Sequence, residues 1–353
     1  MSTQPTYWPD ALTDWAASLF VARGTDTAIA ATVAGILVEG DLLGHDTHGL
    51  ALLGPYLRKI DQGVLSPKGT YDIVSDRPAA MLWDGGGLPG PWLTAEAITT
   101  AGERAKDIGT ATVTIRRSGH IACLAAYLEA PARDGLVIEI YSSDPSVASV
   151  APFGGTRAAF TPNPIGIAIP TSGDPILIDI STSITTNGMS ARLQAAGERF
   201  AGNWLLDNQG RPSDDPAVFD SDPPGTIQLL GGRDAGHKGF GLTLLVEAMT
   251  GGLAAYGRAE APTDWGATVV VRATDPAAFG GLAGFNHELD WLAAACRDNP
   301  PVDLSQPVRL PGQRGLALKR DAVTNGLTLH PQVHDAIAKL AEETGIALPM
   351  PVG

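Results

Sequence analysis

Two histidines, an aspartate and a threonine stand between two glycines in the stretch GHDTHG, Gly44 to Gly49. His45 and His48 are three residues apart, a spacing that brings side chains together on a helix and could begin a metal site. No carboxylate or third histidine stands at an obvious ligand spacing nearby. A neutral imidazole near pH 7 can both donate and accept a proton. The stretch therefore favours an acid/base histidine, with a capped helix start and an exposed His45 as the alternative.

Two other segments combine charge with glycine or hydroxyl residues. GHKGFG, Gly236 to Gly241, predicts a turn that opens an apolar helix, where free amide groups and the helix dipole favour an anion near Lys238. The alternative is that these glycines only allow close packing. Asp179 ends an apolar strand in ILIDISTS. A buried carboxylate needs hydrogen-bond partners, so Asp179 either holds its own loop or orients a catalytic group.

A third segment, GGGLPG from Gly85 to Gly90, matches the GxGxxG pattern of dinucleotide-binding proteins and follows the apolar run AAMLW. Pro89 removes an amide that could have faced a pyrophosphate. With 42 glycines in the chain, such a match arises easily. We interpret GGGLPG as a surface turn.

The hydrophobic patterns predict an α+β protein. Residues 10–43 have apolar positions at helical spacing, with Thr25 or Asp26 as a cap, and the pattern returns after GHDTHG until about Gly63. Asp46 or Thr47 would cap this second segment, which places His48 in its first turn. From about residue 70 the chain has short β-rich runs, which are TATVTI, LVIEIY, IGIAIP, ILIDI and ATVVV. Further helices are predicted in residues 92–109, 242–255 and from Pro331 to Gly345.

Composition excludes several classes of protein. The chain has 353 residues, is 44% hydrophobic and carries a formal charge of −14, which argues against binding to a nucleic-acid backbone. Its two cysteines, Cys123 and Cys296, indicate neither a disulfide framework nor a thiolate zinc site, and they suit a reducing cytoplasm. No apolar run reaches a membrane-spanning length, and the first ten residues lack a signal-peptide pattern. We expect a cytoplasmic protein without a membrane or nucleic-acid partner.

Eight segments, taken in order, resemble the malate/L-lactate dehydrogenase family, which also holds sulfolactate and ureidoglycolate dehydrogenases, diketogulonate reductase and piperideine-2-carboxylate reductase. They are GDLLGHDTHG, RRSGH, APFGG, NPIGIAIP, IDISTS, NWLLDNQGRPSDDP, GHKGFGLTLLVEAMTG and LPGQRG. The resemblance implies an NAD(P)-dependent oxidoreductase, usually a homodimer. It also implies a non-Rossmann cofactor domain with a mostly antiparallel sheet, expected in residues 76–314, and a helical domain from residues 1–75 joined by 315–353.

The resemblance also assigns roles to residues. His48 matches the histidine of the family's D[ST]HG pattern, which gives a proton to the substrate heteroatom or takes one from it, and Asp179 would fix its tautomer. Thr47, His120 and Arg117 are expected at the substrate. The expected cofactor contacts are Asp179, Ile180, Ser181, Thr182, Ser183, His237, Lys238, Gly239, Gly312 and Gln313. No metal is required, and the cofactor is NAD or NADP.

Departures from the family pattern leave the substrate open. Leu52 stands where family members commonly carry an arginine that clamps a substrate carboxylate, so Arg117 is a candidate to supply that charge instead. Pro162 and Gln313 replace a threonine and a glutamate of the pattern. Three hypotheses follow: an oxidoreductase of small 2-oxo and 2-hydroxy acids, a reductase of ketimines next to a carboxylate, and a cofactor-binding protein without turnover.

Overall fold

The computed structural model describes residues 4–352, so residues 1–3 and 353 of the expected helical domain lie outside the described part. The helices are α1 (Pro9–Val21), α2 (Thr27–Leu42), α3 (Leu53–Asp61), α4 (Gly90–Ile108), α5 (Glu129–Arg133), α6 (Asn187–Ala196), α7 (Gly232–Glu247), α8 (Leu282–Arg297), α9 (Gln313–Asn325) and α10 (Pro331–Thr344). The strands are β1 (Thr6–Tyr7), β2 (Asp72–Arg77), β3 (Ala80–Asp84), β4 (Thr110–Ser118), β5 (Val137–Ser143), β6 (Pro164–Ile169), β7 (Ile176–Ser181), β8 (Leu205–Leu206), β9 (Pro212–Ser213), β10 (Thr226–Ile227), β11 (Ala267–Thr274) and β12 (Leu327–Thr328). Among residues 4–352, no helix is both long and apolar enough to cross a membrane.

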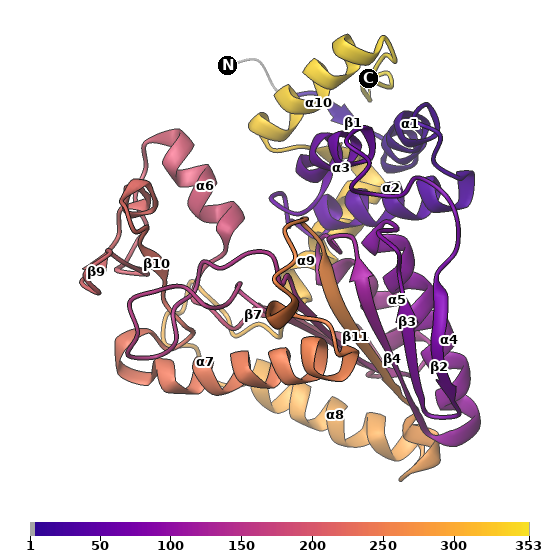
Figure 1. Cartoon of the computed structure of the whole chain (residues 1–353). Helices are drawn as coiled ribbons and strands as arrows, with labels where there is room; N and C mark the ends of the chain where they lie inside the picture. Colours follow the sequence, from indigo (N-terminus) through magenta and orange to yellow (C-terminus); the bar gives the residue numbers. More distant parts are fainter. Residues whose placement is uncertain (1–3, 353) are drawn as a thin grey trace.

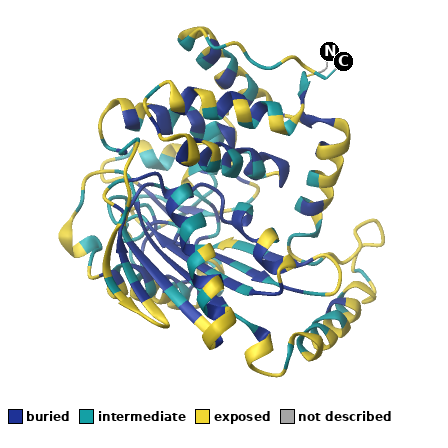
Figure 2. Cartoon of the chain, turned by 90° about the vertical axis from the view of Figure 1, so that its right-hand side faces the viewer, coloured by how far each residue is buried: buried dark blue, intermediate teal, exposed yellow. Residues whose placement is uncertain are grey.

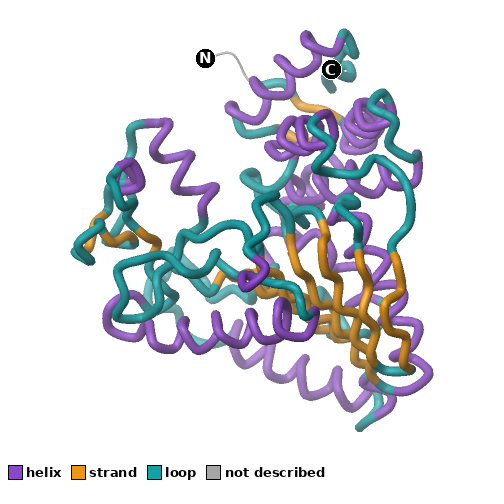
Figure 3. Tube along the Cα trace, viewed as in Figure 1, coloured by secondary structure: helices purple, strands orange, loops and turns teal. Residues whose placement is uncertain are grey.

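A seven-stranded sheet forms the centre of the molecule, in the order β2-β3-β4-β11-β5-β6-β7 (Figures 1 and 3). Its neighbouring strands are antiparallel except β3 and β4, which run parallel and are connected through α4. All five β-rich runs of the sequence form strands of this sheet. The predicted α+β class with a mostly antiparallel sheet is therefore confirmed.

Both faces of the sheet are buried in its middle strands, where side chains alternate between the faces. Val113 of β4 and Val271 of β11 belong to a large core that also contains Ala97, Ala101 and Ala105 of α4. Val270, between two residues of that core, points to the other face and packs with Val246 of α7. Helices α4 and α7 thus cover opposite faces, and the interior between them is buried (Figure 2).

The two chain ends meet at the helical end of the molecule. Thr6 of β1 is paired with Thr328 of β12, and the Tyr7 hydroxyl lies 3.0 Å from Nε2 of His334 on α10. Helices α1, α2, α3 and α10 gather beyond one end of the sheet (Figure 1), and the large core continues from them to the sheet. The loops at this end of the sheet are therefore enclosed between helices and strands.

The turn predicted at GHKGFG is wrong, because all six residues lie inside α7, which begins at Gly232. An added Cβ at Gly239 would lie 2.5 Å from the carbonyl oxygen of Leu230, and one at Gly236 would lie 3.0 Å from the Phe153 ring. These glycines therefore permit close packing of a continuous helix, which outweighs their low helix propensity. Lys238 is exposed and lies in the middle of α7. It is therefore not at a helix N-terminus, where an anion site was predicted.

Candidate active site

The register between β4 and β11 brings His120 beside an aromatic ring. Ser118, the last residue of β4, is paired with Ala267, the first of β11. His120 follows Ser118 by two residues and Trp265 precedes Ala267 by two, so the two side chains leave the sheet at the same edge. Their rings are stacked with centroids 4.6 Å apart. The ring of His48 stacks at 6.1 Å from His120, so two histidines distant in sequence form one cluster.

The GHDTHG loop that carries His48 connects α2 to a short 3₁₀ helix, Leu50–Leu52. A carboxylate oxygen of Asp41, near the end of α2, accepts a hydrogen bond of 2.7 Å from the Leu50 backbone N–H. Gly49 lies so close to this carboxylate that it has no room for a side chain. Asp46 and Thr47, the predicted caps, therefore do not cap this helix. Gly49 precedes the helix, the Asp41 carboxylate accepts from its first amide, and His48 lies before the first turn.

Asp41 is an unusual carboxylate because it lies inside the protein without a cation paired to it among residues 4–352. Burial raises its pKa from 3.8 to about 7, although the hydrogen bond from Leu50 opposes this shift. Its other oxygen has no hydrogen-bond partner in the described residues. Asp41 therefore takes up a proton in the folded state at pH values where the unfolded chain has lost it.

This difference predicts how stability depends on pH. Between its unfolded and folded pKa values, about 4 and 7, Asp41 binds more protons in the native state, so its contribution to stability is complete below pH 4 and is lost as pH rises through 7. Asp41→Asn removes this titration. We expect the variant to gain stability relative to wild type between pH 4 and 8, by up to about 4 kcal/mol. Urea unfolding of both proteins at pH 4, 6 and 8 measures the difference, and a difference that does not change with pH would contradict the assignment.

The neutral tautomer of His120 follows from its hydrogen bonds. Its Nδ1 accepts a 3.2 Å hydrogen bond from the Ala122 N–H, a group that can only donate, so the neutral ring carries its proton on Nε2. The Tyr56 hydroxyl lies 2.9 Å from both this nitrogen and the His120 carbonyl oxygen, so its single proton faces two acceptors. Burial, with a smaller effect of His48, lowers the pKa of His120 to about 3. At neutral pH His120 is therefore an uncharged hydrogen-bond donor.

His48 is positioned by its neighbour Thr47, whose hydroxyl lies 2.8 Å from Nδ1. Burial lowers the pKa of His48, and the negative charge of Asp179 opposes this effect. Asp179 itself accepts hydrogen bonds from the Ala125 N–H at 2.8 Å and the Cys123 thiol at 3.6 Å. The hydrogen bond at Nδ1 of His48 thus comes from Thr47, and a role of Asp179 in fixing the tautomer stays a prediction.

Arg117, the predicted substitute for the missing arginine clamp, is paired with a carboxylate of the sheet in this structure. Its Nε donates to one oxygen of Asp84 at 2.7 Å, while Arg116 donates to the other oxygen at 2.9 Å. Asp84 is nearly buried, and its two oxygens satisfy both arginines. The Arg117 guanidinium is therefore held on Asp84 and does not join the histidine cluster.

GGGLPG forms the turn between β3 and α4, as predicted, but most of it is buried. The Gly87 N–H donates to the carbonyl oxygen of Arg117 at 2.8 Å, and the Gly119 N–H donates to that of Leu88 at 2.9 Å. Gly90 has no room for a side chain because the Gly119 backbone covers it. The turn therefore supports the loop before His120, and that loop covers the helix start that a pyrophosphate would need.

Three of the predicted cofactor residues line one cavity of about 640 Å³, namely Asp179, Ile180 and Gly312. Gly312 adopts a φ of +84°, and an added Cβ would lie 2.7 Å from the side chain of Leu177. Arg309 and Arg314 also line the cavity, are exposed, and form no ion pair within residues 4–352. A cavity of this size with two available guanidinium groups is suited to an anionic organic molecule.

The other predicted cofactor residues do not line this cavity. Ser181 donates to the Ser183 carbonyl oxygen at 2.8 Å, and Thr182 donates to the Pro162 carbonyl oxygen at 3.0 Å. Ser183 likewise donates to a backbone carbonyl, so these hydroxyls hold the end of β7. An added Cβ at Gly239 would lie 3.0 Å from the Thr182 carbonyl oxygen, which places His237 and Lys238 of α7 near that strand end. The Gln313 side chain accepts from the Leu310 N–H at 3.1 Å.

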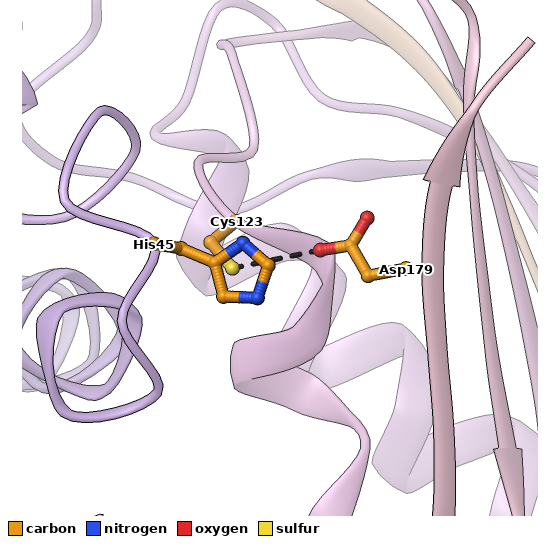
Figure 4. A group of neighbouring side chains, drawn as sticks. All are labelled: His45, Cys123 and Asp179. Carbon is orange, nitrogen blue, oxygen red and sulfur yellow. Dashed lines mark hydrogen bonds between the residues drawn. The ribbon is translucent and has the colours of Figure 1, made fainter. Parts of the chain in front are cut away.

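His45, Cys123 and Asp179 come together beside the cavity, with one ligand atom of each within 4.8 Å of the others (Figure 4). This group could not be recognised from the sequence, because its members come from three distant segments. Burial and the charge of Asp179 raise the pKa of Cys123 well above its usual value. The protonated thiol donates to Asp179, so a metal ion would first have to displace this proton.

We therefore expect chelators to leave activity unchanged. Dialysis against EDTA, followed by an assay with and without added Zn²⁺, tests this expectation. Hydride and proton transfer by the family chemistry need no metal, and the Cys123–Asp179 hydrogen bond is complete without one. A loss of activity that Zn²⁺ restores would assign a catalytic ion to this cluster.

Three residues of the site were not identified as such from the sequence: Asp41, Tyr56 and Trp265. Tyr56 and Trp265 are single aromatic residues in ordinary helical and loop contexts, and only the tertiary contacts reveal them. Asp41 had a signal, because it is one of two carboxylates, with Glu39, on an otherwise apolar helix end, ILVEGDLL.

Comparisons with known proteins agree with the resemblance of the sequence. A family model described as malate/L-lactate dehydrogenase matches residues 8–338. The L-lactate dehydrogenase of Cupriavidus necator is 28% identical over 341 residues, 95% of this chain and 96% of that enzyme. The (2R)-3-sulfolactate dehydrogenase (NADP(+)) of Chromohalobacter salexigens is 32% identical over 305 residues, 81% of this chain and 83% of that enzyme. The crystal structure of malate dehydrogenase from Entamoeba histolytica has the same fold, with a TM-score of 0.92, 21% identity and coverage of 99% of this chain and 100% of that one.

Proposed function

Because the chain belongs to the malate/L-lactate dehydrogenase family, we propose that it is an NAD(P)-dependent oxidoreductase that transfers a hydride between nicotinamide and a small 2-oxo or 2-hydroxy acid. The observation that carries this proposal is the pair of His48 and His120, stacked at 6.1 Å and close to a cavity suited to an anion. One of these histidines exchanges a proton, and the other donates a hydrogen bond.

The residues of the cavity fit a dinucleotide. Arg309 and Arg314 would bind its phosphates, and the close backbone approach at Gly312 leaves the cavity open beside β7. Asp179, Ile180 and His45 also line this cavity, and the ligand atoms of Asp179 and His45 lie within 4.8 Å of each other. Lys238 stays a proposed cofactor contact on the strength of the family resemblance, without the helix-terminus argument. The cofactor, when bound, supplies or accepts the hydride.

The protein supplies proton transfer and polarisation. His120 donates its Nε2–H to the substrate oxygen, because its Nδ1 already accepts from Ala122. His48 takes the hydroxyl proton during oxidation and returns it during reduction, while Thr47 holds its ring through Nδ1. Such acid/base assistance contributes roughly 10²–10⁴ in rate. The same pair can act on a C=N carbon next to a carboxylate, so a ketimine is an alternative substrate.

A panel of 2-oxo acids and cyclic imine carboxylates with NADH and NADPH tests the proposal through the absorbance of the reduced nicotinamide. Turnover of a 2-oxo acid supports it, and turnover of imines alone would replace it with the ketimine reductase. Cofactor binding in a calorimeter without turnover of any panel member would favour the cofactor-binding protein.

Three further features belong to this proposal. The helical unit of residues 1–75 and 315–353 would act as one domain and residues 76–314 as the other, supported by the pairing of β1 with β12. The protein would be a cytoplasmic homodimer, as the family resemblance and the two free cysteines suggest. The proposed partner is a small molecule, with no nucleic acid and no membrane.

A further inference from the structure

Helix α6 lies against the loop that carries His48. The Thr186 hydroxyl caps this helix by accepting from the Met189 N–H at 3.2 Å. Met189 and Leu193, four residues apart, pack into a small core that includes Phe200 and Leu229. Gly188 and Arg192, also four apart, share a different face of the helix. This second face is the one that meets the GHDTHG loop.

Two contacts define the position of that face. An added Cβ at Gly188 would lie 3.6 Å from Cε1 of His48 and 3.6 Å from Cβ of Thr47. One helical turn further on, Nη1 of Arg192 donates to a carboxylate oxygen of Asp46 at 3.0 Å. The positive charge of Arg192 also adds to the lowering of the His48 pKa, which is due chiefly to burial. The guanidinium therefore lies beside the proposed proton-transfer residue.

Other cationic side chains that could bind a substrate carboxylate already have a partner or another proposed role among the described residues. Arg117 is held on Asp84, and Lys319 lies between Glu39 and Glu129 at 2.6 and 2.8 Å. Arg309 and Arg314 line the cavity proposed for the dinucleotide. A carboxylate that is next to the reacting carbon needs a positive partner close to His48. Arg192 satisfies this requirement.

We propose that Arg192 binds the substrate carboxylate beside His48, and that Asp46 holds the guanidinium until the substrate replaces it. This inference rests on the proposed function, and it names the side chain that would make the oxidoreductase specific for substrates with a carboxylate. The exchange replaces one carboxylate with another, so Arg192, whose side chain is 18% exposed, keeps a charged partner throughout. Asp46, at 34% exposed, can be solvated after release. An arginine can bind both oxygens of the incoming carboxylate.

Oxamate and oxamide provide matched probes, since they differ only in that oxamate carries a carboxylate where oxamide carries an amide. Calorimetry would measure the binding of each to wild type, Arg192→Ala, Arg192→Lys and Asp46→Asn, with saturating NADH or NADPH. Arg199→Ala is the matched control, because it removes an arginine from another Arg–Asp ion pair, with Asp214 at 2.7 Å, and has no proposed role in binding. Thermal melting would verify that each variant is folded.

We expect Arg192→Ala to weaken oxamate binding at least about tenfold while oxamide binding stays the same. Arg192→Lys should be intermediate, since it keeps the charge but loses the planar fork. Asp46→Asn should bind oxamate at least as tightly as wild type, because the competing carboxylate is gone. Arg199→Ala should bind oxamate as wild type does, because its ion pair with Asp214 is a separate one.

Three results would overturn the proposal. One is oxamate binding by Arg192→Ala that equals wild type, and another is a wild-type protein that does not bind oxamate. The third is an equal loss in Arg192→Ala and Asp46→Asn, which is what an ion pair that only fastens α6 to the loop would give. Turnover in the substrate panel is measured separately on the wild type, so a failed function and a failed carboxylate site give different results.

Discussion

His48→Ala is expected to lower kcat by roughly 10²–10⁴ while the dissociation constant of NADH or NADPH stays nearly unchanged. The reason is geometric: His48 lies in the cluster with His120 and Thr47, whereas Arg309 and Arg314 line the cavity. Stopped-flow or steady-state kinetics would give kcat, and calorimetry would give cofactor affinity. His287→Ala, at an exposed position on α8, is the matched control and should behave as wild type.

The pKa of His48 adds a dependence on pH. Burial lowers this pKa below 6.5, so the neutral base predominates at pH 7. Reduction needs the protonated ring and should slow as pH rises through a midpoint below 6.5, while oxidation should accelerate over the same interval. Both effects should vanish in His48→Ala. An unchanged kcat in this variant would remove His48 from the mechanism.

His120→Phe is expected to lower kcat/KM by about 10²–10³, the usual effect of losing one hydrogen-bond donor to a reacting oxygen. Phenylalanine preserves a planar ring to stack on Trp265 but removes Nε2–H, the donor that the hydrogen bond from Ala122 assigns. Because the pKa of His120 is about 3, the ratio of wild-type to variant activity should stay constant from about pH 5 to about pH 9.

His120→Gln provides the control for this prediction, because its side-chain amide restores an N–H donor and should recover part of the loss. Thermal melting separates an effect on folding from one on chemistry. Wild-type kinetics in His120→Phe, or a ratio that follows a titration near neutral pH, would show that His120 does not act as a neutral donor.

Patterns that depend on local spacing predicted the structure well. The β-rich runs TATVTI and ATVVV identified β4 and β11, and Pro331 and Gly345 bracket α10 as expected. No pattern in the sequence indicated α6 or α8. At α7 the glycines indicated a turn, whereas contacts with Phe153 and Leu230 make them part of a helix.

In the site, too, sequence motifs identified single residues, whereas contacts between distant segments could not be predicted. The resemblance identified His48 and His120, and the structure places them together. Arg117 was chosen for its proximity to His120 in the sequence, and this choice could not show that its Nε donates to Asp84 on the neighbouring strand β3. No spacing rule could have linked Arg192 to Asp46, since their contact depends on how α6 packs against a loop near the start of the chain.

The place of β11 in the sheet has a consequence for synthesis on the ribosome. This strand lies between β4 and β5, yet it is made after β7, and residues 267–274 supply the hydrogen bonds to both neighbours. In a nascent chain that ends before residue 267, the facing edges of β4 and β5 are therefore unpaired. Such a chain also lacks the strand that follows Trp265 and holds this ring against His120. Premature termination in this interval should yield aggregation-prone fragments, and a chaperone that shields strand edges would be needed until β11 emerges.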